Sequence, residues 1–330
     1  MKFSIIVPIY NRPDEAYELL KSLSEQSFSD FELVLVEDGS TKPCVLEAEK
    51  FIAQFPIHYI VKNNTGRSDS RNVGLANAKG DYFLFFDSDC ILPPQYLETV
   101  NNYLEADYAD CFGGPDRELP SFSPMQKAIN YSMTSFWTTG GIRGGKKKMK
   151  RFEPRTFNMG FSRNVYEKVG DFKHMFGEDI DLCNRIRSSG FSIKLFSDAF
   201  VYHKRRVDLK KFYKQVNIFG QARINIHLLH PGSLRIVHTL PSVAVLGGFC
   251  ILLLSIWLTP WLLALFAVYL LLLFIDAIVK TKNLHIASLA TVASVIQITG
   301  YGIGFILSFI RKIILRQGLE KPEKIIQVYK

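Results

Sequence analysis

Short apolar runs alternate with longer, helix-spaced segments over the first 200 residues of the chain. Apolar runs of strand length lie at residues 3–9, 31–36, 57–61, 82–86 and 193–196. Apolar positions recur with helical spacing at 15–25, 45–55 and 68–78, which predicts helices there. Strands and helices that alternate in this way are typical of a doubly wound, mostly parallel α/β sheet. Ligands of such sheets bind at the carboxyl ends of the strands.

The pattern changes near residue 240, and charged residues are rare from there to residue 310. Residues 241–258 and 261–279 are nearly uncharged and about as long as bilayer-spanning helices, so they predict a membrane hairpin. A third apolar stretch, 286–310, either crosses the membrane as well or bends back between Gly300 and Gly304. Before the hairpin, residues 209–226 separate apolar from polar side chains. This separation predicts an amphipathic helix that lies on the membrane surface.

These changes divide the chain into four parts. We expect a catalytic domain at 1–206, an interfacial helix and linker at 207–235, a transmembrane region at 236–312, and a basic tail at 313–330. The transmembrane region is expected to hold two spanning helices and a third segment that is either spanning or re-entrant.

Charge and cysteine spacing indicate the compartment. The chain has 40 Lys and Arg against 31 Asp and Glu, a formal net charge of +9. Such an excess suits an anionic phospholipid surface, an anionic substrate or a nucleic acid. The basic cluster at 204–214 directly precedes the hairpin, which predicts a multi-pass protein of the cytoplasmic (inner) membrane with its catalytic domain in the cytosol. The five cysteines show no paired spacing, which agrees with a reducing compartment.

Polar motifs stand where three of the predicted strands end. They are Tyr10-Asn11-Arg12, Glu37-Asp38-Gly39-Ser40 and Asp87-Ser88-Asp89. Because the carboxyl ends of parallel strands share one edge of a sheet, we expect a common nucleotide crevice there. The third motif follows a buried strand, and its two carboxylates need a cation. Mg²⁺ or Mn²⁺ takes oxygen ligands and can bridge two phosphates. A nucleic-acid partner would explain the net charge but not this pair of carboxylates, so we expect none.

Four motifs in order carry a family resemblance over roughly residues 3–205. They read VPIYNRP, VEDGS, GRSDSRNVGLANAKGDYFLFFDSD and FGEDIDLCNRIRSSGF. Together they resemble the motifs of inverting family 2 glycosyltransferases, which have the GT-A fold. The resemblance implies a nucleoside-diphosphate sugar donor, a divalent metal and one carboxylate base.

The resemblance also implies which residues bind the donor. Asp38 would accept the imide N–H of uracil, although capping of its own turn is the alternative. Asp89 would bind the metal together with His203, which otherwise has a structural role. Arg71 would lie near the sugar or the phosphates. An equally favoured alternative is that Arg71 forms a salt bridge on a helix surface. The complete predicted nucleotide-sugar site consists of Pro8, Tyr10, Asn11, Asp38, Arg71, Asp87 and Ser88.

Inversion requires a base that takes the proton of the acceptor hydroxyl. Three carboxylates, Glu178, Asp179 and Asp181, stand at the start of a predicted helix, where free backbone N–H groups keep a carboxylate ionised. By resemblance Asp179 is the base and Glu178 its neighbour in acceptor binding. Asn158, Asp181 and Arg185 complete the predicted acceptor site, and Arg185 is also expected to pair with Asp181 one turn away.

The membrane segments restrict the acceptor. We expect a lipid-linked saccharide of cell-surface polysaccharide or glycolipid synthesis that receives a single sugar. A processive polysaccharide synthase is the alternative, although residues 215–229 contain no Q-x-x-R-W motif. A polyprenyl-phosphate sugar synthase is a weaker alternative, because Arg12 stands where that subgroup has Glu. The basic loop at 144–151 either binds lipid head groups or acceptor phosphates, or is simply solvated.

Overall fold

A computed structural model describes residues 2–139, 152–204 and 208–318. These residues form two compact units, one from 2–117 and 152–203 and the other from 118–139 and 204–318. The basic loop at 144–151 and most of the tail at 313–330 lie outside the described residues, so the predictions for them stay predictions.

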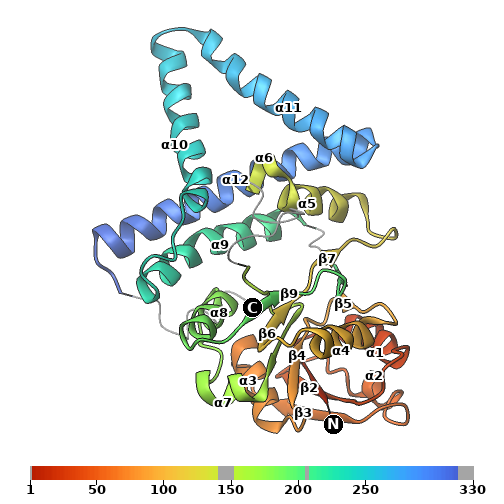
Figure 1. The fold of residues 1–330 in the computed structure, drawn as a ribbon. Coiled ribbons are helices and arrows are strands. Elements are labelled where there is room, and N and C mark those ends of the chain that lie inside the picture. Colours follow the sequence, from red (N-terminus) through yellow and green to blue (C-terminus); the bar gives the residue numbers. More distant parts are fainter. Residues whose placement is uncertain (1, 140–151, 205–207, 319–330) are drawn as a thin grey trace. The chain divides into compact units, whose positions relative to one another are not determined.

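A seven-stranded sheet forms the centre of the first unit (Figure 1). Its order is β3 (Ile57–Lys62), β2 (Phe31–Asp38), β1 (Phe3–Ile9), β4 (Tyr82–Phe85), β8 (Met159–Ser162), β6 (Cys111–Gly113) and β9 (Ile193–Leu195). Strand β8 runs antiparallel to both of its neighbours, whereas all the other pairs in this sheet are parallel. The predicted doubly wound, mostly parallel sheet is therefore confirmed.

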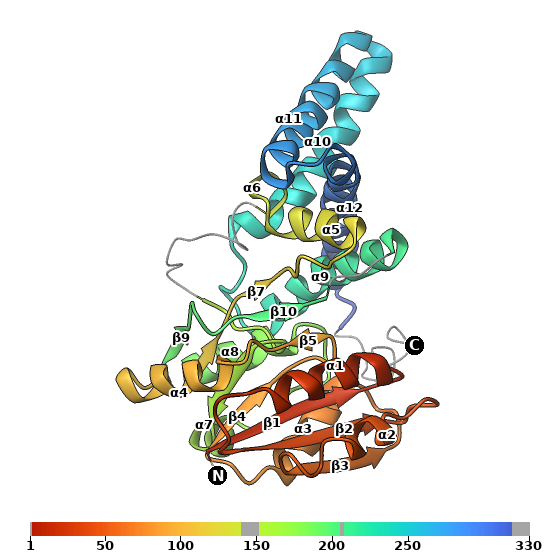
Figure 2. The same cartoon turned by 90° about the vertical axis from the view of Figure 1, so that its right-hand side faces the viewer.

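Helices cover both faces of this sheet (Figure 2). They are α1 (Pro13–Ser24), α2 (Val45–Glu49), α3 (Arg67–Asn77), α4 (Tyr96–Ala106), α7 (Arg163–Val169) and α8 (Glu178–Ser188). Alternate residues of β1 point to opposite faces, so that Ile5 packs in a core with Leu20 of α1, and Ile6 in a core with Leu75 of α3. Helix α2 ends at Glu49, which is shorter than the predicted 45–55 segment.

A small second sheet completes the first unit. It consists of β5 (Cys90–Ile91), β10 (Val201–His203) and β7 (Asp116–Arg117), with β10 in the middle. Strand β10 pairs antiparallel with β5, and this register sets His203 directly opposite Cys90. Strand pairing thus brings His203 beside the Asp87-Ser88-Asp89 motif.

The second unit is helical. It contains α5 (Pro124–Thr134), α6 (Phe136–Thr139), α9 (Leu209–Leu229), α10 (Ile236–Trp257), η1 (Pro260–Leu263), α11 (Ala264–Thr281), α12 (Leu284–Phe309) and η2 (Ile310–Ile314). Helices α10 and α11 form a hairpin joined through η1 (Figure 1). Three stretches, Ile236–Trp257, Pro260–Thr281 and Leu284–Ile314, are long and apolar enough to cross a membrane.

Helix α5 belongs to this second unit, which differs from the expected unbroken catalytic domain at 1–206. Its Ile129 and Met133 pack with Phe212 and Val216 of α9. The Tyr131 hydroxyl donates to Asp276 of α11 at 2.5 Å. The segment resembles the rest of the first 200 residues in composition, so the sequence held no local sign of this change of unit.

Helix α12 runs uninterrupted through Gly300 and Gly304. The predicted alternative, in which the segment bends back between these glycines, is therefore wrong. The glycines instead allow close contact between helices. A Cβ atom on Gly304 would lie 2.1 Å from the backbone oxygen of Asn217 in α9. The Asn217 side chain in turn donates to the Gly300 carbonyl at 3.0 Å.

Part of the α9 face that we expected to contact lipid is buried in protein. Phe212 and Val216 are fully buried and pack in one cluster with Ala293 of α12. The predicted polar face contacts α12 as well, through Asn217. The location of α9 at a membrane surface stays a prediction.

The α9–α12 contact can be tested with Gly304→Ala. Overpacking of a close contact costs about 1–3 kcal/mol, so we expect this variant to unfold at a lower temperature in detergent than the parent protein. Gly247→Ala in α10 is the matched control, because a Cβ atom there meets open space. Folded protein can be measured by size exclusion after heating. Equal loss from both variants would contradict the close packing.

Candidate active site

The carboxyl ends of β1, β2 and β4 lie side by side in the sheet and bring the polar motifs to one edge. Asn11 follows β1, Asp38 is the last residue of β2, and Asp87 lies two residues beyond β4. The shared edge that the sequence predicted is therefore present in the structure.

Asp38 organises the turn between β3 and α3. Its Oδ1 accepts from Lys62 Nζ at 2.5 Å and from the Thr65 backbone N–H at 3.0 Å. Its Oδ2 accepts from the Gly66 backbone N–H at 2.9 Å. A carboxylate offers about four acceptor positions, so these three bonds leave one position on Oδ2. The turn-capping alternative is thus part of what Asp38 does, and a single further acceptor position remains.

Asn11 holds the loop that follows β2. Its backbone adopts a left-handed conformation with φ 55°, and its Oδ1 accepts from the backbone N–H groups of Thr41 and Lys42 at 2.8 and 2.9 Å. Its own N–H donates to Ser40 Oγ at 2.7 Å. The side chain thus holds the loop at this edge of the sheet through protein contacts. Pro8 and Tyr10 are both half-buried beside it.

Asp89, Cys90 and His203 form a cluster that could hold a metal ion. Asp89 Oδ1 lies 3.1 Å from His203 Nε2, and one ligand atom of each of the three residues lies within 4.8 Å of the others. The imidazole stacks on Phe157 at 4.6 Å between ring centres, which fixes its orientation. A carboxylate and an imidazole are a donor set that Mn²⁺ accepts, so these residues fit the predicted metal. Cys90 was not predicted as a ligand; it follows Asp89 directly in the chain, and strand register sets it opposite His203.

Arg71 joins Asp87 to Glu178, the residue that precedes the predicted base Asp179. Its side chain is fully buried, donating to Asp87 Oδ1 at 2.8 Å and to Glu178 Oε1 at 3.0 Å. Arg67 also contacts Glu178, at 2.8 Å from Nε to Oε1. Arg71 thus forms salt bridges, as the alternative held, but they lie in the interior and not on the helix surface. Glu178 is buried and bound by both arginines.

Asp179 stands at the N-terminal end of α8, behind Gly177, whose φ of 83° suits glycine. Its Oδ2 accepts from Arg155 Nη1 at 3.2 Å, and its Oδ1 from the Ile180 N–H at 2.8 Å. Burial raises the pKa of this carboxyl, but the charges of Arg155 and Arg67 outweigh burial and hold the pKa below its usual value. The group is therefore ionised at neutral pH, as a base must be.

The other predicted site residues bind protein groups. Buried Asn158 accepts from the Tyr96 hydroxyl at 2.5 Å and donates to the Ala199 carbonyl at 2.9 Å. Asp181 pairs with Arg185 at 2.8 Å, which confirms the expected i,i+4 pair. Ser88 Oγ donates to Glu15 of α1 at 3.3 Å. Acceptor binding by Asn158, Asp181 and Arg185 stays a prediction.

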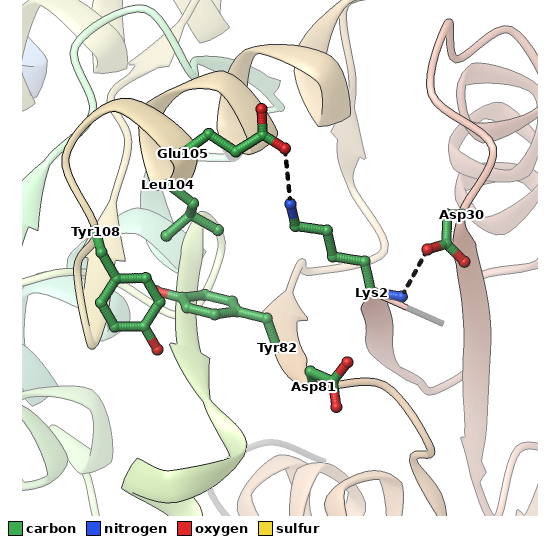
Figure 3. A pocket seen from close by; sticks show the side chains of 7 residues that line it. All are labelled: Lys2, Asp30, Asp81, Tyr82, Leu104, Glu105 and Tyr108. Atoms are coloured by element: carbon green, nitrogen blue, oxygen red, sulfur yellow. Dashed lines mark hydrogen bonds and ion pairs between the residues drawn. The ribbon is translucent and has the colours of Figure 1, made fainter.

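A pocket lies at the other end of the same sheet (Figure 3). It is lined by Lys2, Asp30, Asp81, Tyr82, Leu104, Glu105 and Tyr108. Lys2 precedes β1 and Asp81 precedes β4, so the pocket lies where the strands begin. The polar motifs lie where the strands end, at the opposite end of the sheet from this pocket.

Residues 4–170, half of the chain, match the model of glycosyl transferase family 2. The chain belongs to this family, and its first unit has the GT-A fold that the sequence resemblance implied.

Three known proteins are similar to the chain. An uncharacterized glycosyltransferase of Haemophilus influenzae is 41% identical over 104 residues, which cover 31% of this chain and 34% of that protein. Glycosyltransferase AglE of Haloferax volcanii is 26% identical over 253 residues, covering 74% of this chain and 80% of that protein. The mannosyltransferase PcManGT of Pyrobaculum calidifontis, solved with GDP-Man and Mn²⁺, has a TM-score of 0.57 at 16% identity, covering 96% of this chain and 88% of that one.

The metal cluster predicts the effect of two substitutions. Asp89→Ala should abolish Mn²⁺-dependent binding of UDP, because it removes the carboxylate ligand. His203→Ala should weaken it less, because one donor of several is lost. Calorimetric titration of Mn²⁺ and UDP into each variant measures both, with Asp30→Ala at the far end of the sheet as the control. Retained metal dependence in Asp89→Ala would show that the cluster is not the metal site.

Proposed function

We propose that this protein transfers a single sugar, with inversion, from a UDP-sugar to a hydroxyl group of a lipid-linked saccharide. The main support is that Asp38, Asp87, Asp89 and Asp179 are grouped around the strand ends of one unit, with Arg71 connecting Asp87 to the start of α8. Asp38 suits the nucleotide and Asp87 the sugar. Asp89 suits the metal and Asp179 the acceptor proton.

The acceptor position left on Asp38 favours uracil over guanine and cytosine. Uracil has one ring N–H between two carbonyl groups, so a single acceptor satisfies it. Guanine has two neighbouring N–H donors, and one of them would lack a partner at this carboxylate, which costs binding energy. Cytosine has an unprotonated ring nitrogen that an ionised carboxylate repels. The bonds from Lys62, Thr65 and Gly66 therefore support a uridine nucleotide.

Asp89 and His203 would hold Mg²⁺ or Mn²⁺. When bound, such an ion acts as a Lewis acid that neutralises charge on the departing diphosphate. Asp87 is 35% exposed while it is bound to Arg71, so its second oxygen is available to a ribose or sugar hydroxyl. The chain thus divides the donor between a base-binding carboxylate, a sugar-binding carboxylate and a metal-binding carboxylate.

Asp179 takes the acceptor proton in this proposal, and Glu178 has a different role from the predicted one. Both oxygens of Glu178 are bound by arginines, Oε1 by Arg71 and Oε2 by Arg67 at 3.0 Å each. Glu178 is therefore a positioning residue that holds α8 against α3. Asp179 lies next to it, with 14% of its side chain exposed.

The three membrane-length helices support an acceptor at a lipid surface. We place the protein in the cytoplasmic membrane as a multi-pass protein with the catalytic unit in the cytosol, near anionic phospholipid. Addition of a single sugar is favoured over processive synthesis, because residues 215–229 have no Q-x-x-R-W motif.

The base assignment is tested by Asp179→Asn, which keeps the shape of the side chain but cannot accept the proton. Sugar transfer or donor hydrolysis should fall by roughly two to four decades, the usual effect of losing a general base. UDP binding in the presence of Mn²⁺ should stay nearly unchanged, because the donor-binding carboxylates are intact. If turnover survives within a few-fold, another group is the base.

The nucleotide is tested by competition. UDP should bind more tightly than GDP or CMP, because the single acceptor position left on Asp38 matches the single ring N–H of uracil. Asp38→Asn should weaken UDP by about tenfold or more, since a hydrogen bond to a charged group contributes about 1.5–3 kcal/mol. The same change should affect GDP less. Tighter binding of GDP or CMP than of UDP to the parent protein would remove the uridine assignment.

A further inference from the structure

The contact between Arg155 and Asp179 is unexpected for a base that must accept a proton. Arg155 Nη1 lies 3.2 Å from Asp179 Oδ2, and the two side chains are 22% and 14% exposed. A carboxylate bound to a guanidinium is stabilised as the anion, which makes it a weaker base. A general base works best when its pKa lies close to the pH of the surrounding solution.

The charged and titratable groups near Asp179 come from several elements. Arg155 lies in the segment before β8, and Arg67 comes from α3. Glu178 and Cys183 belong to α8 itself, and Glu153 lies close enough to Arg155 to act on its charge. Arg67 is already engaged by Glu178. The Arg155 contact is therefore the strongest restraint on Asp179, and it acts directly on one oxygen of the carboxylate.

We propose that Arg155 is a positioning residue that restrains Asp179 as a base while no acceptor is bound. This inference rests on the proposed function, in which Asp179 takes the acceptor proton. In hydrolysis of the donor, water replaces the acceptor. A water O–H bond breaks, its proton goes to Asp179, and the oxygen bonds to the anomeric carbon as the sugar–phosphate bond breaks and its electron pair leaves with UDP.

Arg155 opposes this side reaction because it stabilises the ionised carboxylate that water must protonate. The donor is thus protected from loss to water. A partly exposed guanidinium can be reached by oxygen atoms of an acceptor, which would take over its hydrogen bond and leave Oδ2 for the proton. Loss of the Arg155 charge should therefore increase hydrolysis, whereas a residue with only a structural role would decrease it or leave it unchanged.

The experiment measures UDP release by the full chain in detergent, without acceptor. UDP-glucose, UDP-galactose and UDP-N-acetylglucosamine are the donors, with Mn²⁺ and near neutral pH. Arg155→Gln should hydrolyse the best of them about three- to tenfold faster than the parent, a part of the whole general-base effect. Arg155→Lys keeps the charge and should stay within about twofold of the parent. Arg187→Gln is the matched control, because Arg187 contacts the nearby Phe152 carbonyl at 2.9 Å.

Two further readouts separate basicity from structure. The parent's Asp179 has a lowered pKa, so its hydrolysis should stay level as the pH falls toward 5. In Arg155→Gln the pKa of Asp179 rises, so the acid fall in rate should begin at a higher pH. The added substitution Asp179→Asn should remove the gain of Arg155→Gln. Arg155→Met repeats the test if the glutamine variant does not fold.

The outcomes distinguish this inference from the proposed function. If the parent binds no UDP with Mn²⁺, the proposed function fails. If the parent binds UDP but both neutral Arg155 variants hydrolyse donor at or below the parent rate, Arg155 does not restrain the base, and this inference alone is overturned. The inference is also overturned if a neutral Arg155 variant hydrolyses donor faster but its rate begins to fall at the same acidic pH as that of the parent.

Discussion

The fully buried charge of Arg71 is the constraint on which the active site depends. A guanidinium in the interior is costly unless it is paired, and Arg71 is paired with two carboxylates and lies 5.8 Å from the ring centre of Phe172. One carboxylate, Asp87, lies just beyond β4, and the other, Glu178, begins α8. Asp89 and Asp179 are close neighbours of these two residues in sequence. One side chain therefore ties the position of Asp89 to that of Asp179, the proposed base.

The arginines around this edge also explain why its carboxylates differ in exposure. Glu178 is bound by two arginines and buried, whereas Asp87 shares one of them and is partly exposed. Asp179 has its own partner in Arg155. An active site for an anionic donor needs positive charge, yet free arginines would bind the diphosphate without regard to its orientation. Arginines bound to carboxylates instead orient the few carboxylate oxygens that stay accessible.

Most of the catalytic fold could be predicted from the sequence, because alternating strands and helices are local patterns. The strand-end position of Asp38 and Asp87 followed from the same patterns. The partners of these residues could not be predicted, since Arg71 and Glu178 are 107 residues apart and no periodicity relates them. Cys90 and His203 are likewise joined only by strand register. The course of α12 was left open because glycines serve both bends and close helix contacts.

Helix α5 has a consequence for how the chain is made. Its Tyr131 binds Asp276, which is 145 residues further along the chain. Chains emerge from the ribosome from the N-terminal end, and segments that pair over such a distance must wait for their partners. The strands that follow α5 are synthesised before α11 and α12, so the catalytic sheet can close while α5 still lacks its partners. During this interval the apolar side of α5 lacks its partners in α9, α11 and α12, and a chain cut after residue 206 would never supply them.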